Sequence, residues 1–296
     1  MLAARTPLQA PLPSAVVAWE SNFSRRDYIS AVERVIELIL AGDLFQANIA
    51  QRFTARISAS FDPLALYHRL RSLNPAPFAA LLRYGKLTIA SSSPERFLKL
   101  GGRNVETRPI KGTIARSVDA KEDQRRAEFL CASEKDRAEN IMIVDLLRSD
   151  LSRVCTAHSV EVQVLCGLES YASVHHLTSV ITGELTPQED AVTLLKACFP
   201  GGSITGAPKI RSMEIINEIE GVAREVYCGS IGFIGFSGYM DTNIAIRTVT
   251  VSDDLAAFHA GSGITAMSDP EAEYDETITK AQRIFDAFDD DGHGAS

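Results

Sequence analysis

Lys111 stands in the segment ETRPIKGT, between Pro109 and Gly112, where the sequence is too irregular for a helix. A lysine is usually a solvated surface residue, and that is the simplest interpretation here. A lysine held in this setting and partly removed from water would instead present a neutral amine able to attack carbon. Glu95, in SSSPERF, is by itself a turn residue after Pro94.

Two pairs of acidic residues lie three positions apart on predicted helices: Asp136 with Glu139, and Glu273 with Glu276. This spacing puts both carboxylates on the same side of a helix, and two such edges facing one another would form an oxygen-only site for Mg2+. Acidic pairs are more often solvated helix surface, so spacing alone leaves both interpretations open. Lys280, four residues after Glu276, fits either as an ion-pair partner or as a second charge in the same site.

Three further segments carry polar residues among apolar ones. Arg247 lies in NIAIRTVTV, which we expect to be a buried strand, and a buried arginine needs an anion from the protein or from a substrate. His175 and His176 are neighbours in a strand-like run, so at most one of them faces any given pocket. The segment 201–209 lacks the Gly-Lys-Ser/Thr ending of a phosphate loop. What remains is a glycine turn before a helix, which either binds an anion through its free N–H groups or simply caps the helix.

The composition limits the class of protein that holds these residues. Of 296 residues, 45% are hydrophobic, and the net charge of -8 leaves no basic face for nucleic acid. No run approaches the roughly 18 apolar residues that span a bilayer. The five cysteines are dispersed and form no CxxC, which supports neither a disulfide framework nor a zinc site. We therefore expect a cytoplasmic protein with no membrane and no nucleic-acid partner.

Hydrophobic periodicity predicts which elements position the candidate residues. Helices are expected over 24–41, after Asp62, from about 119 to 151, near 188–197, after the glycine turn at 201–209 and over 269–288. Strands are expected over 44–57, in hairpins at 78–93 and 96–110, around 160–165 and 171–184, and over 229–251 and 255–267. Strands and helices clustered in this order indicate an α+β fold with a mainly antiparallel sheet.

Taken together, these segments resemble the chorismate-utilising enzymes, which include anthranilate synthase component I, aminodeoxychorismate synthase component I and the isochorismate and salicylate synthases. The resemblance runs from about residue 20 to 288 and rests on nine motifs in the family's order: SPERF, TRPIKGT, KDRAENIMIVDLLRSDL, VHHLTS, FPGGSITGAPKIRSMEII, GSIGF, MDTNIAIRT, AGSGI and EAEYDET. It implies antiparallel sheets that form a sandwich flanked by helices, with the N-terminal part truncated. We expect a chorismate-binding catalytic domain over 19–288, between a disordered leader (1–18) and a disordered tail (289–296).

Lys111 distinguishes members within this family. It resembles the lysine of the aminodeoxychorismate synthases, whereas anthranilate synthases carry alanine there. The resemblance implies that Lys111 adds to C2 of chorismate as the C4 hydroxyl leaves, with Glu95 as the general acid, and that ammonia then attacks C4 and expels the lysine. The product, 4-amino-4-deoxychorismate, leads to 4-aminobenzoate and folate. Gln46 stands where isochorismate synthases use a lysine base, which disfavours addition of water, and His176 matches the family's pocket histidine.

The same matching implies the ligand-binding residues. Mg2+ would be held directly by Glu139 and Glu276, with Asp136 and Glu273 beside them. Phe233 replaces the tyrosine that the family usually has in GSIGY, so one hydroxyl contact to the substrate is missing. The residues implied to bind substrate are Ser203, Arg247, Gly263, Lys280, Phe233 and Thr113.

The chain shows no Cys-His glutaminase constellation, so the resemblance implies that ammonia comes from a separate glutamine amidotransferase subunit. Two alternatives stay open. Anthranilate synthase component I would aminate C2 and release pyruvate, and a non-catalytic subunit would bind chorismate without turning it over.

Overall fold

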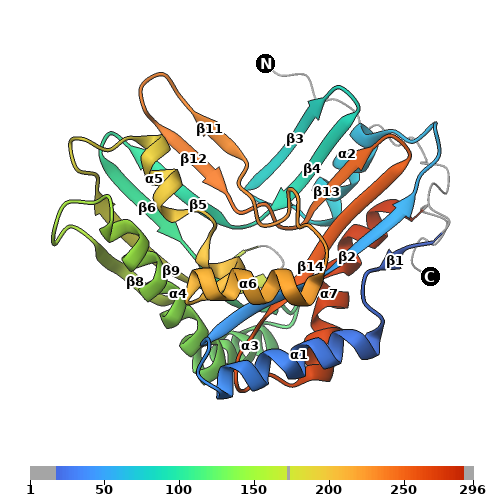
Figure 1. The fold of residues 1–296 in the computed structure, drawn as a ribbon, viewed down its shortest axis with the longest axis horizontal. Coiled ribbons are helices and arrows are strands. Elements are labelled where there is room, and N and C mark those ends of the chain that lie inside the picture. Colours follow the sequence, from blue (N-terminus) through green and yellow to red (C-terminus); the bar gives the residue numbers. More distant parts are fainter. Residues whose placement is uncertain (1–17, 172–173, 290–296) are drawn as a thin grey trace.

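Two antiparallel sheets form the framework of the chain in the computed structural model, which describes residues 18–171 and 174–289 (Figure 1). The first sheet has the strand order β1-β2-β14-β13-β4-β3, and β10 pairs with β2. Its strands are β1 (Glu20–Ser21), β2 (Gln46–Arg56), β3 (Phe78–Tyr84), β4 (Leu87–Ser93), β10 (Gly206–Ala207), β13 (Thr248–Ser252) and β14 (Leu255–Ile264).

The second sheet has the order β11-β12-β5-β6-β9-β7, and β8 pairs with β9. Its strands are β5 (Arg96–Gly101), β6 (Asn104–Arg108), β7 (Ile110–Ala115), β8 (Glu161–Ser170), β9 (Val174–Glu184), β11 (Gly232–Ile234) and β12 (Met240–Asn243). The expected α+β fold with antiparallel sheets is confirmed, as are the hairpins β3–β4 and β5–β6.

The helices begin where short-range signals predict. Ser24 caps α1 and accepts a hydrogen bond from the backbone of Asp27, and Asp269 caps α7, whose first residue is Pro270. The helices are α1 (Arg25–Leu40), α2 (Pro63–Leu73), α3 (Ala120–Ala132), α4 (Glu134–Ser152), α5 (Ala191–Cys198), α6 (Lys209–Glu220) and α7 (Pro270–Phe288).

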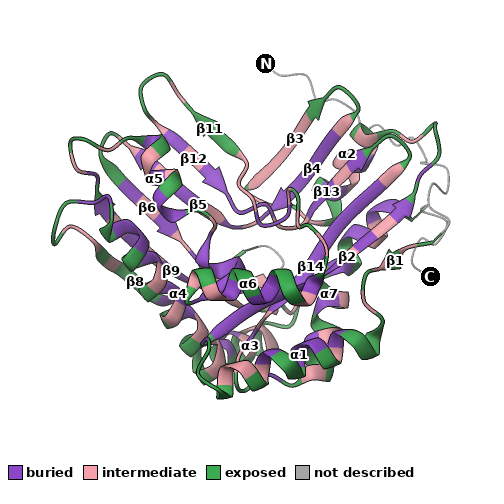
Figure 2. Cartoon of the chain, viewed as in Figure 1, coloured by how far each residue is buried: buried purple, intermediate pink, exposed green. Residues whose placement is uncertain are grey.

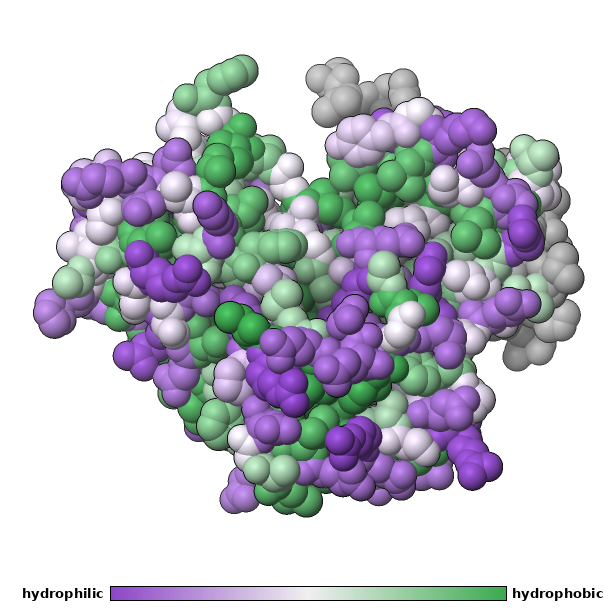
Figure 3. All heavy atoms as spheres, in the orientation of Figure 1, coloured by the Kyte–Doolittle hydropathy of each residue, from purple (hydrophilic) through white to green (hydrophobic). Residues whose placement is uncertain are grey.

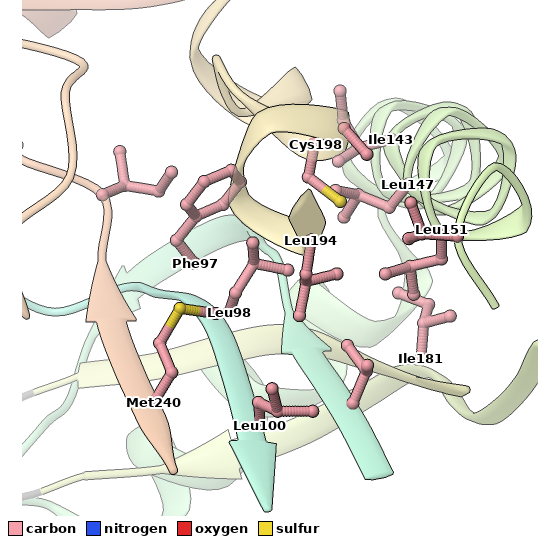
Figure 4. Packing of buried hydrophobic residues seen from close by; sticks show 14 of the residues in the cluster. Phe97, Leu98, Leu100, Ile143, Leu147, Leu151, Ile181, Leu194, Cys198 and Met240 are labelled. Carbon is pink, nitrogen blue, oxygen red and sulfur yellow. The ribbon is translucent and has the colours of Figure 1, made fainter. Parts of the chain in front are cut away.

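Each sheet carries its own helices. Helices α1, α6 and α7 pack on β2 and β14 of the first sheet, while α3 and α4 pack on β7, β8 and β9 of the second. One hydrophobic core lies between α4, α5 and the second sheet, where Leu147 and Leu151 of α4 meet Leu98, Ile181 and Leu194 (Figure 4). The apolar stripe of α7 closes a second core against the first sheet.

Strand β2 is buried along most of its length, and its two faces differ (Figure 2). Ala47 and Ile49 pack with α1 and α6, whereas Ala50 packs with core residues of the second sheet. Because side chains alternate along a strand, Gln46 and Asn48 share the face of Ala50 and point toward the second sheet. This face of β2 forms one side of the candidate site.

The surface is hollowed between the arm formed by β11 and β12 and the arm formed by β3 and β4, and hydrophobic residues lie on both walls (Figure 3). In the described part of the chain, no helix is both long enough and apolar enough to cross a membrane. The predicted leader and tail lie outside the described residues, except for residues 18 and 289. The single domain over 19–288 stays a prediction.

Candidate active site

Lys111 lies on β7 at a local irregularity of the sheet. The register between β7 and β9 shifts between Lys111 and Thr113, and the intervening Gly112 has a φ of +78°, which favours glycine. A Cβ on Gly112 would also lie 3.0 Å from the Asp136 side chain, so α4 approaches the strand closely. The irregularity directs the Lys111 amine toward the interior, where it donates a hydrogen bond to the carbonyl oxygen of Ser203 at 3.2 Å.

Glu95 meets the same group of residues from the turn before β5. Its side chain is buried, and the Ser203 hydroxyl donates to its carboxylate at 2.7 Å. Burial raises the pKa of Glu95 to about 7, although the Ser203 hydrogen bond and the nearby charges of Lys111 and Lys280 act in the opposite direction. A carboxyl with such a pKa can hold a proton at neutral pH and give it to a leaving group.

Ser203 connects the two residues from a short 3-10 turn, Gly202–Ile204. Gly202 lets this turn approach α4 closely, because a Cβ would come within 2.5 Å of the end of the Leu146 side chain. The glycine turn predicted at 201–209 therefore places a serine beside Lys111 and Glu95. The 3-10 turn does not run directly into α6, which begins at Lys209.

Gln46 and Gly263 form the opposite wall. A Cβ on Gly263 would lie 2.3 Å from the Gln46 amide nitrogen and 3.3 Å from the Lys111 amine, so any side chain here would displace the end of Gln46. Gln46 is completely buried, and neither polar atom of its side chain has a hydrogen-bond partner in the described structure. A buried and unpartnered amide beside a lysine amine is expected to meet a ligand or a water molecule.

The two histidines point in different directions, as their strand position predicts. His176 Nδ1 and the Thr113 hydroxyl share a hydrogen bond of 2.7 Å, and burial together with the Arg247 charge lowers the His176 pKa to about 4. His175 instead contacts Asp123 on α3 at 3.0 Å. His176 is therefore neutral at physiological pH.

Arg247 does not lie in a strand, contrary to the sequence prediction. It precedes β13 with a φ of +49°, which few residues other than glycine adopt. Its guanidinium donates to the Asn74 side-chain oxygen at 2.9 Å and makes no ion pair with a carboxylate among the described residues. Burial lowers the pKa of this group. An arginine in this environment, without an anionic partner, is suited to an anionic substrate.

The acidic edges of α4 and α7 lie close together. Lys135 of α4 forms an ion pair with Glu273 of α7 at 3.1 Å, and its pKa is raised because Glu273, Glu139 and Glu276 outweigh the opposite effect of burial. Glu276 pairs with Lys280 at 2.6 Å. These contacts bring the acidic edges of α4 and α7 to the same place, which is the condition that the sequence analysis set for a Mg2+ site.

No group of three or more histidine, cysteine, aspartate or glutamate side chains within 18–171 and 174–289 is placed to hold a metal ion. The chemistry of the residues nevertheless fits a hard cation. Neither the Asp136 nor the Glu139 carboxylate has a hydrogen bond or an ion pair to a described residue. Burial raises the pKa of Glu139, against the effect of Lys111 and Lys135, because the ionised carboxylate is removed from water without a direct partner; a bound cation would supply that partner.

The remaining substrate-binding candidates divide into two groups. Lys280 donates to the backbone oxygen of Gly261 at 3.0 Å and acts electrostatically on Glu95, which places it at the site. Phe233 lies on β11 with 58% of its surface exposed, and its ring is 5.7 Å from that of Tyr239. No hydrogen bond, ion pair or ring contact among the described residues joins Phe233 to Lys111 or Glu95.

Two residues of the site were not found by sequence reasoning. Asn74 holds Arg247 from the end of α2, and the sequence marked it only by the Asn-Pro pair that follows the helix. Lys135 lies between the acidic edges, and its position four residues before Glu139 on the same helix was an available signal.

Comparisons with known proteins show the family of the chain. A family model described as chorismate binding enzyme matches residues 2–286. The chain is 49% identical over 266 residues to aminodeoxychorismate synthase component 1 of Escherichia coli K12, covering 90% of this chain and 58% of that protein. It is 42% identical to anthranilate synthase component 1 of Aquifex aeolicus, covering 92% of this chain and 54% of that protein.

Solved structures give the same result for the fold. The crystal structure of anthranilate synthase component I from Streptococcus pneumoniae superimposes with a TM-score of 0.84 at 36% identity, over 93% of this chain and 61% of that one. The chain thus spans a little more than half the length of these relatives.

Proposed function

The chain belongs to the chorismate-binding enzyme family, and we propose that it aminates chorismate at C4 as the catalytic part of an aminodeoxychorismate synthase component 1. The observation that carries this proposal is the Lys111 amine, held by the Ser203 carbonyl beside the buried Glu95. An amine nucleophile paired with a carboxylic acid of raised pKa is the combination that displacement of a hydroxyl requires.

The proposed reaction has two displacements. The Lys111 nitrogen forms a bond to C2 of the ring, both ring double bonds shift, and the C4–O bond breaks as Glu95 protonates the departing hydroxyl to water. Ammonia then bonds to C4, the two double bonds shift back, and the C2–N bond breaks to release Lys111, while the proton lost by the incoming nitrogen returns to Glu95. The sum is chorismate plus ammonia giving 4-amino-4-deoxychorismate plus water.

The surrounding residues bind and orient the substrate in this proposal. Arg247, which makes no ion pair within the described part of the chain, receives a carboxylate of chorismate. Thr113, fixed by the neutral His176, presents its hydroxyl to the substrate from the strand that carries Lys111. Gly263, which has no side chain, lets the Gln46 amide and the Lys111 amine lie close to the backbone of β14. Ser203 orients Glu95, and Lys280 contributes positive charge.

Mg2+ is part of the proposal. Glu139 and Glu276 would hold the ion, with Asp136 and Glu273 beside it, and Lys135 would have to give up part of its present contact with Glu273. When bound, the cation neutralises a substrate carboxylate in this acidic environment. Component 1 names imply a second subunit, and we propose that a glutamine amidotransferase supplies the ammonia.

The test is to incubate the purified chain with chorismate, Mg2+ and ammonium and to identify products by chromatography and mass. We expect 4-amino-4-deoxychorismate from the wild type and none from Lys111→Ala. Lys121→Ala, an exposed lysine on α3, is the matched control and should leave the product unchanged. Without ammonium, intact-protein mass should show an adduct of chorismate minus water on the wild type only.

Other products distinguish the alternatives. Anthranilate with released pyruvate would refute C4 amination and favour anthranilate synthase activity, which the similarity to the Aquifex aeolicus protein keeps as the second candidate. Binding of chorismate without turnover or adduct would favour a non-catalytic subunit.

A further inference from the structure

Strand β2 lacks a neighbouring strand along part of one edge. β14 pairs with the other edge, whereas on this edge the pairs with β10 end at Ala47 and those with β1 begin at Phe53. The backbone groups between these two points are buried, and buried N–H and C=O groups are almost always hydrogen-bonded. Other parts of the chain must therefore supply the partners that a strand would give.

A buried ion pair fills this gap. Glu220, the last residue of α6, and Arg224 lie 2.6 Å apart and leave only 1% and 15% of their side chains exposed. The backbone amide of Ala50 donates to the Glu220 carboxylate at 2.8 Å, and Arg224 donates to the Asn48 carbonyl oxygen at 2.5 Å. The pair thus takes the place of a strand beside the middle of β2.

Arg224 also reaches the turn that carries Ser203. It donates at 2.9 Å to the carbonyl oxygen of Ile204, the residue that follows Ser203. All five N–H groups of the guanidinium have acceptors, which are both oxygens of Glu220, the carbonyl oxygens of Ile204 and Asn48, and the sulfur of Cys228. Because a guanidinium is a planar fork of fixed shape, these contacts hold the turn at a fixed distance from β2.

The turn in turn decides where Ser203 lies. It has no side-chain cap of its own. It is tied to β2 by the Asn48 amide, which donates to the Thr205 carbonyl oxygen at 2.8 Å, and by Arg224. On this turn the Ser203 hydroxyl donates to Glu95, and the Ser203 carbonyl oxygen accepts from Lys111.

We propose that Arg224, held by Glu220, is a positioning residue of the candidate active site. It fixes the turn on which the Ser203 hydroxyl meets Glu95 and the Ser203 carbonyl oxygen meets Lys111. Since every donor of Arg224 is bound within the protein, the guanidinium acts through the backbone of the turn and not on the substrate. The effect on rate rests on the proposed function, whereas the effect on Glu95 needs no turnover.

A displaced turn has a directional effect on Glu95. Burial raises the pKa of Glu95 to about 7, and the hydrogen bond from Ser203 acts against burial because it favours the ionised carboxylate. A weaker bond from Ser203 therefore raises this pKa further, and the protonated form persists to higher pH. A purely structural role for Arg224 would lower stability without moving the Glu95 pKa.

Arg224→Lys is the first variant, because it keeps the charge beside Glu220 but lacks the fork that reaches Ile204 and Asn48 together. We expect kcat to fall roughly 10- to 100-fold with the Kd for chorismate little changed, since a small displacement of catalytic groups is costly. The pH at which kcat falls to half should rise by about 0.5 to 1 pH unit.

A second variant removes both charges. Arg224→Met combined with Glu220→Gln leaves no unpaired ion in the interior and keeps an acceptor for the Ala50 amide, so it should fold and show the same two effects. Arg211→Met breaks a more exposed ion pair with Glu214 on α6 and is the matched control, which should leave both values unchanged. Circular dichroism verifies the fold of each variant.

A double-mutant cycle shows whether the effect passes through Ser203. In a Ser203→Ala background, Arg224→Lys should no longer move the pH at which kcat falls to half. A shift that persists without the Ser203 hydroxyl would overturn the proposal. Unchanged kcat and pH dependence in both Arg224 variants would overturn it as well.

The pH dependence of unfolding gives a readout independent of turnover. The Glu95 pKa is obtained by comparing wild type and Arg224→Lys, each with and without Glu95→Gln, in urea at several pH values. An upward shift of this pKa in Arg224→Lys supports the proposal, and an unshifted pKa overturns it. Absence of any aminated product from the wild type would count against the proposed reaction itself and leave this second readout to decide the role of Arg224.

Discussion

Replacing Glu95 by glutamine should stabilise the protein at pH 8 and change its stability much less at pH 5. The Glu95 pKa is about 7 in the folded chain, against an ordinary value of 4.5. The favourable contribution of the protonated side chain is therefore complete below pH 4.5 and is lost as pH rises through about 7. This difference corresponds to about 3 kcal/mol at 1.36 kcal/mol per pKa unit, which Glu95→Gln should recover at pH 8.

The free energy of unfolding is measured by urea denaturation of wild type and variant at both pH values. The single tryptophan, Trp19, packs 5.0 Å from Phe258 and reports on the core beside the first sheet. Glu33→Gln, an exposed carboxylate on α1, is the control and should show no such pH dependence. A stability difference between wild type and Glu95→Gln that is equal at pH 5 and pH 8 would refute the argument that burial raises the Glu95 pKa.

The same substitution should impair the proposed reaction. Loss of a general acid lowers kcat by roughly 100- to 10,000-fold, so Glu95→Gln is expected to be more stable at pH 8 and far less active. Activity of the wild type should fall as pH rises through about 7, because the protonated form of Glu95 is the one that acts. A pH-rate profile that is flat between pH 6 and 8.5 would remove Glu95 from this role.

Three other perturbations test separate parts of the structure. Gly263→Ala should lower activity while circular dichroism stays unchanged, because its Cβ would lie 2.3 Å from the Gln46 amide nitrogen and displace that side chain; full activity would show that the Gln46 side chain moves aside without affecting the reaction. Arg247→Met should raise the KM for chorismate roughly 10- to 150-fold through loss of charged hydrogen bonds worth about 1.5–3 kcal/mol, and an unchanged KM would place the substrate carboxylates elsewhere. Leu147→Ala, in the core between α4 and the second sheet, should cost about 2–5 kcal/mol in urea denaturation, and a loss below 1 kcal/mol would mean that the cavity closes.

Local signals in the sequence predicted most elements and their ends. The Ser24 and Asp269 caps, the Asp62-Pro63 helix start and the Gly101-Gly102 turn all depend on interactions between residues close in the chain. Hydrophobic periodicity is equally local, because it reports which face of an element is buried. The motif order also predicted the family, which the family model and the relatives confirm.

The backbone conformation and the long-range contacts of individual residues could not be predicted from local signals. Arg247 lies in an apolar run that is typical of a strand, yet it adopts a left-handed backbone before β13. The acidic spacing on α4 and α7 predicted two carboxylate edges but not the lysine between them, because Lys135 reaches Glu273 across 138 positions of sequence. Such contacts depend on which helices pack together.

The sequence by itself determined the residue types, the elements that carry them and the family to which the chain belongs. Only the tertiary structure decided that Lys111, Glu95 and Ser203 meet, since Ser203 is 92 positions from Lys111 and 108 from Glu95. It also decided the Glu95 pKa, which depends on burial. The physical reason is that propensity and capping act over a few residues, whereas burial and sheet pairing join distant segments.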